Sequence, residues 1–237
     1  MSNRKKFDEA KHQLNLLMYR QDVEKGNFIK VETGELLDYK ENVDFYFFHE
    51  NNKILLDKVL LVARPFRYLL LHKKENTICS NVDEVYPSLF KDVSIDRVSE
   101  LHIAGRLDVD TTGLVLITDN GRWSYQIITP ASQCPKVYRV DLSRPIADDA
   151  KVKFQHGVQL QGEEKLTLPG SLKIIAPTRV QLTITEGKFH QVKRMFAAVG
   201  NKVKALHREQ IGSIVLDVEP GQWRYLTEAE INSFTAN

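Results

Sequence analysis

Two regions with different hydrophobic patterns follow one another along this chain. The first begins with a stretch at about Phe7–Glu24 that has the pattern of a helix. Two short apolar runs, Asn27–Val31 and Val43–Phe48, have the pattern of strands, and the turn-forming residues Gly26 and Gly34 border the first of them. The first part of the chain is therefore expected to fold as a small α/β unit.

A change in composition marks the end of this unit. The apolar run Phe45–Phe48 is followed by the polar segment His49–Lys53 and then by a new apolar stretch that ends before Pro65. Shifts of this kind are typical of domain boundaries. We therefore expect two domains, residues 1–60 and residues 61–237.

Strand patterns dominate the second domain. Runs rich in β-branched and aromatic residues predict strands at Tyr68–Leu71, Gly113–Thr118, Lys136–Leu142, Arg179–Thr185 and Ser213–Val218. Helical patterns fall at Ala147–Phe154, His190–Val199 and Glu228–Phe234. Thr227 and Glu230 form a capping-box pattern at the start of the last helix. Strands mixed irregularly with helices favour an α+β fold with a mainly antiparallel mixed sheet.

Composition narrows the possible functions only a little. No stretch approaches the ~20 apolar residues of a membrane-spanning helix, and the polar start lacks the apolar core of a secretory signal. We therefore expect a cytoplasmic protein with no membrane partner. Cys79 and Cys134 are the only cysteines, too few for a zinc cluster, and both are expected to be reduced. With 33 basic and 31 acidic residues, the net charge of +2 neither requires nor excludes a nucleic-acid partner.

The segment that carries the most chemical information is Ala104–Gly121. Structure alone explains its second half, because Leu114–Thr118 has a strand pattern and Asn120-Gly121 is typical of a type I′ turn. Its first half places two aspartates, Asp108 and Asp110, in a loop that leads directly into that strand. Loops on a rigid sheet often hold catalytic carboxylates, whereas the structural alternative is that both aspartates cap turns with their own side chains.

A phosphatase is another alternative for the same residues. Asp108-Val-Asp110-Thr-Thr112 matches the D-x-D-x-T pattern of haloacid-dehalogenase-type phosphatases, in which the first aspartate attacks phosphate beside Mg²⁺. That family places the motif after a parallel strand in an alternating α/β domain. This chain lacks the alternation, and Gly105-Arg106-Leu107 precedes the motif, so the phosphatase is disfavoured.

A family resemblance covers most of the second domain. The run GRLDVDTTGL, residues 105–114, closely resembles the G-R-L-D-x-x-T-x-G-L signature of RNA pseudouridine synthases. The longer segments HIAGRLDVDTTGLVLITDNGRWSYQIITP and CPKVYRV are similar to the RsuA family, which modifies small-subunit ribosomal RNA. TEGKFHQVKRMFAAVGN, LHREQIG and the terminal YLTEAEI extend the resemblance, which covers residues 64–237. It implies a pseudouridine-synthase catalytic domain that isomerises a uridine in RNA.

The resemblance also implies three catalytic residues and neither a cofactor nor a metal. Asp108 matches the family's catalytic aspartate, a nucleophile toward either the ribose C1′ or the base. Tyr138 matches the tyrosine that stacks on the target base, and its hydroxyl is a candidate to move the C5 proton. From its strand position alone, Tyr138 would be expected in the core. Lys193 matches the basic residue that pairs with the aspartate and favours its charged form.

Helical geometry distinguishes Lys193 from its basic neighbour Arg194. At about 100° per residue, one face of the predicted helix is apolar, formed by Val192, Met195, Phe196 and Val199. Arg194 lies nearly opposite this face, whereas Lys193 lies on its edge and can extend from the packed helix into a cleft. Lys193 is therefore the expected partner of Asp108, and Arg194 the expected phosphate contact.

Other polar residues of the motifs are expected to bind RNA. The full set is Arg106, Thr112, Lys136, Lys188, His190, Gln191, Arg194 and Arg208. Lys202 and Lys204 add to the basic residues of this part of the chain, and His207 lies among them. A charge run alone would be expected to be solvated surface, but beside the catalytic signature it indicates a positive wall along an RNA-binding cleft.

Two segments depart from the family pattern. Residues 25–45 resemble the latter half of the alpha-L RNA-binding domain of this family, without its usual basic first helix. The family motif N-K-P-x-G keeps only its lysine here, as Lys73. His72, Lys74 and Asn76 replace its Asn, Pro and Gly, so we expect a changed loop backbone.

The expected partner is ribosomal RNA or a small-subunit precursor particle, and the enzyme is expected to act as a monomer. A non-catalytic RNA-binding or ribosome-assembly factor with the same fold is the alternative. The presence of Asp108, Tyr138 and Lys193 argues against it.

Overall fold

In the computed structural model the chain divides into two compact units, Met1–Pro65 and Phe66–Asn237. The structure describes residues 65–91 and 93–234 and, in the first unit, the backbone of four short strands. These are β1 (Phe28–Lys30), β2 (Leu36–Leu37), β3 (Ile54–Leu56) and β4 (Val59–Leu60). They form an antiparallel sheet in the order β2-β1-β3-β4. β1 lies within the predicted strand 27–31, whereas the predicted helix 7–24 and strand 43–48 lie outside the described residues.

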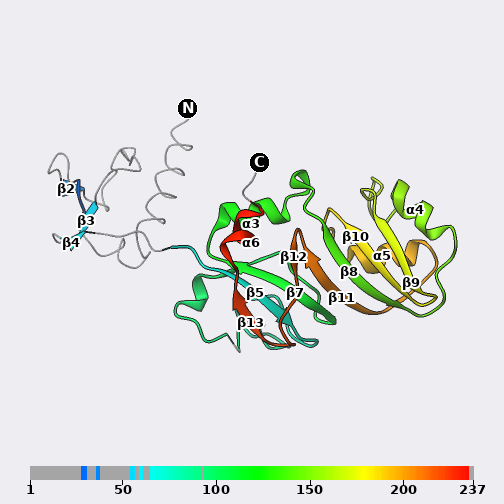
Figure 1. The fold of residues 1–237 in the computed structure, drawn as a ribbon, viewed down its shortest axis with the longest axis horizontal. Coiled ribbons are helices and arrows are strands. Elements are labelled where there is room, and N and C mark those ends of the chain that lie inside the picture. The colour runs from blue at the N-terminus through cyan, green and yellow to red at the C-terminus, as the bar shows by residue number, and fades with distance from the viewer. Residues whose placement is uncertain are drawn as a thin grey trace. The chain divides into compact units, whose positions relative to one another are not determined.

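The second unit is built on a nine-stranded sheet (Figure 1). Its strands are β5 (Tyr68–Lys73), β6 (His102–Ala104), β7 (Thr111–Thr118), β8 (Lys136–Leu142), β9 (Ser171–Ala176), β10 (Arg179–Ile184), β11 (Val203–Ile211), β12 (Ile214–Val215) and β13 (Trp223–Tyr225). The strand order is β13-β5-β7-β11-β8-β10-β9, with β6 beside β7 and β12 beside β11. Among these pairs only β7 and β11 are parallel, which confirms the predicted α+β fold with a mainly antiparallel mixed sheet.

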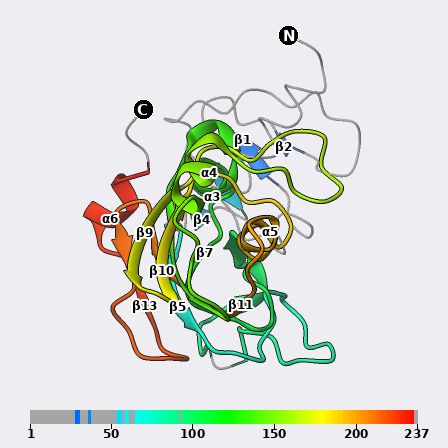
Figure 2. The ribbon, with the colours of Figure 1, turned by 90° about the vertical axis from the view of Figure 1, so that its right-hand side faces the viewer.

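Helices pack on both faces of this sheet. The helices are α3 (Gly121–Ile128), α4 (Ala150–His156), α5 (Gln191–Ala198) and α6 (Glu228–Asn232), with single 3-10 turns at η1 (Val98–Glu100) and η2 (Pro130–Ser132). Helices α4 and α5 cover one face, and α3 and α6 cover the other. Figure 2 shows α5 and α6 on opposite sides of the strands.

The alternation of side chains along the strands produces this two-sided core. On one face, Leu114 and Leu116 pack with Trp123 of α3. On the other face there are two hydrophobic clusters, one over β8 and β10 with α4 and α5, and one over β5 and β7 with the segment between β5 and β6. Leu107 packs against both of these clusters. The loop between β6 and β7 is therefore anchored where they meet, and Leu107 directly precedes Asp108.

Most predicted elements of the second unit are present, and one local prediction is wrong. Strand β8 has the predicted bounds, and the predicted Thr227–Glu230 capping box is formed at α6. Asn120-Gly121 is not a hairpin turn. The side chain of Asn120 caps α3 by accepting hydrogen bonds from the backbone N–H groups of Arg122 and Trp123, both at 3.1 Å. Asn is a favoured helix N-cap as well as a turn former, and here the cap is realised.

Gly113 allows β7 and β11 to lie close together directly after the Asp108 loop. Its φ is +111°, and an added Cβ would lie 2.3 Å from the carbonyl oxygen of Arg208 and 2.6 Å from its nitrogen. Both obstacles are backbone atoms of β11, which pairs with β7 here. No flexible side chain can move aside, so only glycine fits without distorting the two strands.

We predict that Gly113→Ala lowers the free energy of unfolding by at least about 2 kcal/mol, from the strained φ and the backbone overlap. Thermal or urea unfolding measures the loss. Gly121→Ala is the matched control, because an added Cβ meets nothing within 4 Å there. The control should change stability by no more than about 0.5 kcal/mol. Equal stability of the two variants would contradict the close approach of the strands.

Candidate active site around Asp108

Asp108 lies at the centre of a cluster of charged groups between the β6–β7 loop and α5. Its Oδ2 accepts a hydrogen bond from Lys193 Nζ at 2.9 Å, and its Oδ1 lies 3.4 Å from His190 Nε2. The Asp108 side chain is 28% exposed, so the carboxylate remains accessible. The loop thus presents a carboxylate that a cation stabilises on one side and that stays open on the other.

Lys193 also binds the second aspartate of the motif. Its ammonium lies 2.6 Å from Asp110 Oδ1, so one cation bridges both carboxylates. Burial opposes ionisation of Asp110, but the hydrogen bond and charge of Lys193 outweigh it and lower the pKa of this carboxyl. Burial likewise opposes the charge on Lys193, and the bonds to Asp110 and Asp108 overcome it and raise the pKa of the ammonium. The bridge therefore favours the charged forms of Asp110 and Lys193.

The packing of α5 brings Lys193 to this position. Val192, Met195 and Phe196 are buried in the cluster over β8 and β10, as the helical phase predicts. Lys193 lies at the edge of this buried face and reaches Asp108, which is the contact that its phase predicts. Its catalytic role stays a prediction.

Arg208, on β11, binds the beginning of the Asp108 loop. Its side chain, in a residue only 2% exposed, donates to the carbonyl oxygen of Leu114 at 2.7 Å and to that of Gly105 at 2.8 Å. A buried guanidinium needs acceptors to replace water, and these carbonyls supply them. The sequence indicates Arg208 as an RNA contact, but its described bonds all lie within the protein.

Lys73 holds the end of the same loop. This lysine is fully buried, and its Nζ donates to the carbonyl oxygens of Lys74, Val109 and Thr111 at 3.0, 3.2 and 2.8 Å. Burial lowers the pKa of the ammonium, while the nearby carboxylates of Asp110 and Asp108 oppose that shift. Its place as the one retained residue of the family loop motif is the sequence feature that singles it out.

Asn76 occupies the place of the glycine in that loop motif. Its φ is +61°, in the left-handed region that glycine adopts most easily and that asparagine tolerates better than most residues. Its backbone N–H donates to the carbonyl oxygen of Val109 at 2.9 Å. The left-handed turn is therefore present without a glycine, and it forms a further link to the Asp108 loop.

Tyr138 lies on β8 beside Arg208. It is 8% exposed, and its hydroxyl accepts a long hydrogen bond from Arg208 Nη1 at 3.5 Å. The guanidinium carbon lies 6.0 Å from the centre of the tyrosine ring. Tyr138 is thus linked through Arg208 to Gly105 and the start of the Asp108 loop. Its role toward a base stays a prediction.

A cavity of about 610 Å³ opens in front of Asp108. Its walls include Asp108, Arg106, Lys188, Phe189 and His190. The β6–β7 loop and the turn before α5 therefore form two sides of one space, which apolar residues line together with the charged ones. Arg106, Lys188 and His190 are three of the residues predicted to bind RNA.

Other residues predicted to bind RNA have partners inside the protein. Lys136 is buried, and its Nζ donates to the carbonyl oxygen of Ile127 at 2.7 Å, at the end of α3. Thr112 Oγ1 lies 2.8 Å from His207 Nδ1. Burial, followed by the charge of Arg139, lowers the pKa of His207 to about 4, so this ring is neutral at pH 7. These contacts give Lys136 and Thr112 structural roles, and an RNA contact of either stays a prediction.

Arg194 and Lys188 share one acidic partner. Glu163 accepts from Lys188 Nζ at 3.1 Å and from Arg194 Nη1 at 3.2 Å, which ties the segment between α4 and β9 to α5. Arg194 also donates to the carbonyl oxygen of Phe189 at 3.0 Å. Gln191 is buried and donates to Glu186 Oε1 at 2.7 Å. The expected phosphate contact of Arg194 would compete with Glu163.

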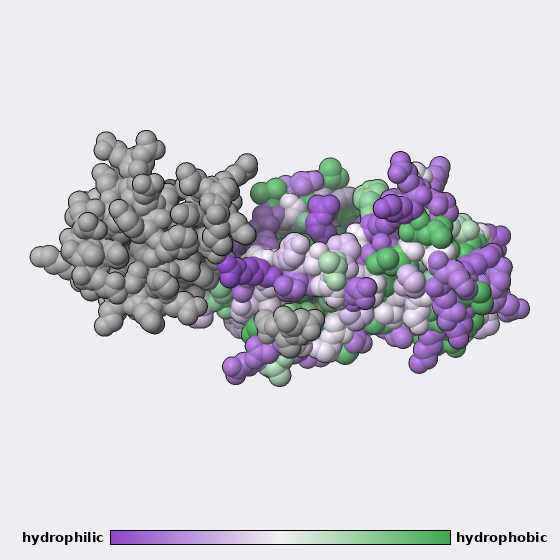
Figure 3. Space-filling model, turned by 90° about the horizontal axis from the view of Figure 1, so that it is seen from above, coloured by the Kyte–Doolittle hydropathy of each residue, from purple (hydrophilic) through white to green (hydrophobic). Residues whose placement is uncertain are grey.

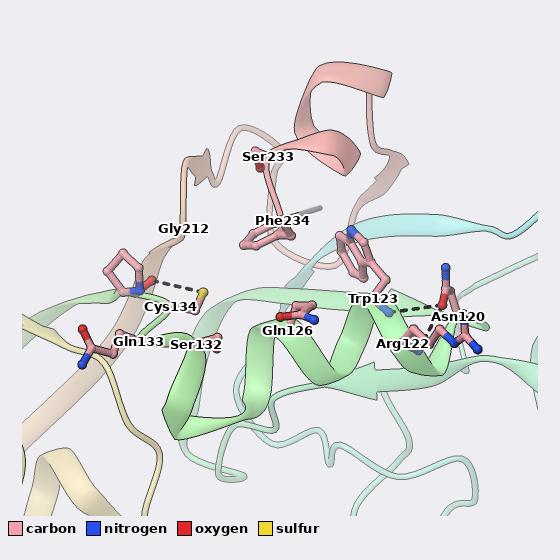
Figure 4. A pocket seen from close by; sticks show the side chains of 11 residues that line it. Asn120, Arg122, Trp123, Gln126, Ser132, Gln133, Cys134, Gly212, Ser233 and Phe234 are labelled. Atoms are coloured by element: carbon pink, nitrogen blue, oxygen red, sulfur yellow. Dashed lines mark hydrogen bonds between the residues drawn. The ribbon is translucent and has the colours of Figure 1, made fainter. Parts of the chain in front are cut away.

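A second cavity, of about 370 Å³, lies among α3, η2 and α6 (Figure 4). Trp123 and Phe234 meet edge to face at its wall, with ring centroids 5.3 Å apart, and Cys134 and Gln126 also line it. Asp108 is not among its lining residues. This cavity is therefore separate from the charged cluster.

The surface, possible metal sites and possible membrane-spanning helices are the remaining features of the described residues that could indicate a ligand or a membrane. Figure 3 shows hydrophilic and hydrophobic residues interspersed over the unit Phe66–Asn237. Within residues 65–91 and 93–234, no three His, Cys, Asp or Glu side chains gather in a way that could hold a metal ion. No helix in the described part of the chain is long and apolar enough to cross a membrane.

Comparisons with known proteins agree with this geometry. Residues 67–198 match the RNA pseudouridylate synthase family. The chain is 52% identical over 169 residues to the ribosomal small subunit pseudouridine synthase A of Vibrio cholerae, an alignment that covers 70% of this chain and 73% of the relative. It is 46% identical over 211 residues to the enzyme of the same name from Escherichia coli K12, covering 88% and 90%.

A solved structure extends the similarity to the fold. The crystal structure of a pseudouridylate synthase superposes with a TM-score of 0.71 at 36% sequence identity, and covers 95% of this chain and 98% of that one. These similarities confirm the resemblance to the RsuA family and do not favour the phosphatase. With its aspartate–lysine pair inside a segment that matches over residues 67–198, this chain belongs to the RNA pseudouridylate synthase family.

Proposed function

We propose that this protein isomerises a uridine of small-subunit ribosomal RNA to pseudouridine, with Asp108 as nucleophile. The observation that carries the proposal is the accessible Asp108 carboxylate, held at 2.9 Å by Lys193 at the edge of a cavity of about 610 Å³. The choice of RNA rests on the two relatives named as small-subunit enzymes. We further propose a cytoplasmic monomer that acts on the RNA or on a precursor particle, with residues 1–60 as an alpha-L type RNA-binding domain.

The reaction needs no atoms beyond those of the uridine and water. Asp108 attacks either the ribose C1′ or the base, the bond from C1′ to N1 breaks, and the released uracil turns within the site. A new bond joins C1′ to C5, and the bond between Asp108 and the nucleotide breaks, which frees the carboxylate. The proton on C5 leaves, and N1 gains a proton, so the substrate and the product have the same composition.

The surrounding residues divide the remaining tasks. Lys193 donates a hydrogen bond to Asp108 and places a positive charge beside this nucleophilic carboxylate. Tyr138 offers a flat ring for a base taken out of its stack, and its hydroxyl moves the C5 proton. Arg106 and Lys188, on the walls of the cavity, hold the RNA backbone.

Asp108→Asn should reduce pseudouridine formation to below a tenth of the wild-type rate while RNA binding and folding stay nearly unchanged. Asn keeps the volume of the side chain but cannot act as the nucleophile. Nucleoside analysis of digested RNA measures the product. Asp110→Asn is the matched control and should be mild, whereas a phosphatase would need both acids. Equal and complete loss in both variants would favour that alternative.

Tyr138 variants separate stacking from proton transfer. Tyr138→Phe keeps the ring and removes the hydroxyl, so it should bind RNA normally and turn over slowly if the hydroxyl moves the proton. Tyr138→Leu keeps only bulk and should lose at least tenfold in affinity or rate, since stacking on a base contributes ~1–3 kcal/mol. Binding and single-turnover rates measure both. Full activity of Tyr138→Leu would exclude both roles.

Lys193→Met should move the rising limb of the rate–pH profile to higher pH. Lys193 holds the pKa of Asp110 below its ordinary value, so this pKa rises when the ammonium is lost. The site therefore reaches its fully charged form only at higher pH, and the rate rises later in the titration. Rates measured against pH, with an NMR titration of the Asp110 carboxyl, test the shift.

Arg194→Met is the control for that variant. It removes the neighbouring cation, whose partners are Glu163 and the carbonyl oxygens of Phe189 and Gln161, so the pH profile should stay in place. If Arg194 contacts a phosphate, the salt dependence of RNA binding should fall by roughly one counterion. A pH shift with Arg194→Met and a salt effect with Lys193→Met would reverse the two assignments.

A further inference from the structure

Phe189 is an exposed aromatic residue at the edge of the active-site cavity. It is 72% exposed, although Phe is among the residues most often found inside proteins. It lines the same cavity as Asp108. Its immediate neighbours in the chain are Lys188 and His190, so it is a single apolar ring between polar groups. An exposed ring of this kind beside a reactive carboxylate indicates a contact with the substrate.

The turn that carries Phe189 is braced from several directions. Gln191 Oε1 accepts the backbone N–H of Lys188 at 2.8 Å, and the amide of Gln191 donates to buried Glu186 at 2.7 Å. Arg194 Nη1 donates to the carbonyl oxygen of Phe189 itself at 3.0 Å. The ring is therefore displayed on a fixed backbone, which lowers the entropy lost when a ligand packs against it.

One face of the Phe189 ring contacts a neighbouring side chain, and most of the residue is exposed to solvent. The imidazole of His190 stacks on it, with ring centroids 3.7 Å apart and an interplanar angle of 23°. His190 in turn lies 3.4 Å from Asp108 through its Nε2. A continuous series thus runs from the carboxylate through the imidazole to the exposed ring. A planar group that continues this stack would lie beside the reacting nucleotide.

The residues around the Phe189 ring indicate which class of ligand it binds. A protein partner would need a wider apolar area, whereas the cavity walls next to the ring carry Lys188 and Arg106. A flat apolar face with cations around it suits an unpaired nucleobase, whose ring stacks while its phosphate meets the basic groups.

From these contacts we infer that Phe189 stacks on the base of a nucleotide that flanks the target uridine in the RNA. Phe189 is thereby a positioning residue, which holds the RNA so that the target nucleotide reaches Asp108. The inference rests on the proposed function for the identity of the ligand and deepens it. Phe189 makes no contact with the reacting atoms, so its loss acts on binding and on how the substrate is placed.

The test pairs a protein variant with a matching change in the RNA. The probe is a short fragment of small-subunit ribosomal RNA that contains an unpaired uridine converted by the wild-type protein, prepared intact and with an abasic residue at each unpaired neighbour. Affinity and single-turnover rate are measured for the wild-type full-length protein, for Phe189→Ala and for Phe189→Trp. Tyr225→Ala is the control, because Tyr225 is an exposed aromatic residue on β13 that does not line the cavity.

Phe189→Ala should lose about tenfold in affinity for the intact RNA, as expected for one lost base stack, and Phe189→Trp should restore it. The loss should disappear on the RNA that lacks the flanking base, because no ring is left to stack. Tyr225→Ala should bind every RNA like the wild type. Wild-type affinity of Phe189→Ala for the intact RNA would overturn the inference. An equal loss on the intact RNA and on every abasic RNA would also overturn it.

The same measurements separate this inference from the proposed function. Affinity requires no turnover, so a base-dependent loss in Phe189→Ala supports the stack even for a fragment in which no uridine is converted. In that case the abasic residues are placed in turn at every unpaired position. Absence of pseudouridine in all small-subunit RNA treated with the wild-type protein would contradict the proposed function and leave the stacking result standing.

Discussion

Two buried cations hold the β6–β7 loop that carries Asp108, and the geometry of the candidate site depends on them. A charge removed from water is stable only where other groups replace its hydration. The carbonyl oxygens of Val109 and Thr111 do this for Lys73, and that of Gly105 does it for Arg208. The loop and the cations therefore stabilise each other. Movement of the loop would remove acceptors from both buried charges, which makes such movement costly.

The Asp108–Lys193 pair joins this loop to helix α5. Asp108 lies in the loop that leads into β7, and β7 contributes to the cluster over β5 and β7. Lys193 lies on α5, whose apolar side packs in the cluster over β8 and β10. The 2.9 Å contact between them is thus set by the packing of two separate parts of the core. Leu107, which packs against both clusters, links the two parts directly beside Asp108. Preorganisation of this kind lowers the cost of placing charge in the reaction.

Features of local origin could be predicted from the sequence, and features set by strand pairing could not. Helical phase distinguishes Lys193 from Arg194, because it depends only on spacing within one helix, whereas the pairing of Lys193 with Asp108 follows from the family resemblance. The sequence predicts Lys136 and Arg208 at an RNA surface, whereas both lie buried in strands β8 and β11. Which side chains a sheet covers depends on neighbouring strands and on their register. Asn120 suits a turn and a helix cap equally, and only the chain that follows decides between them.

The left-handed turn at Asn76 shows what is required at this point of the catalytic domain. The turn delivers a backbone N–H to the carbonyl oxygen of Val109, and a backbone group is the same in every residue except proline. The link needs a torsion angle that glycine adopts most easily and that asparagine also tolerates. The loop therefore keeps its bond to Val109 with a side chain at position 76, because the contact is made by the peptide group and not by the side chain.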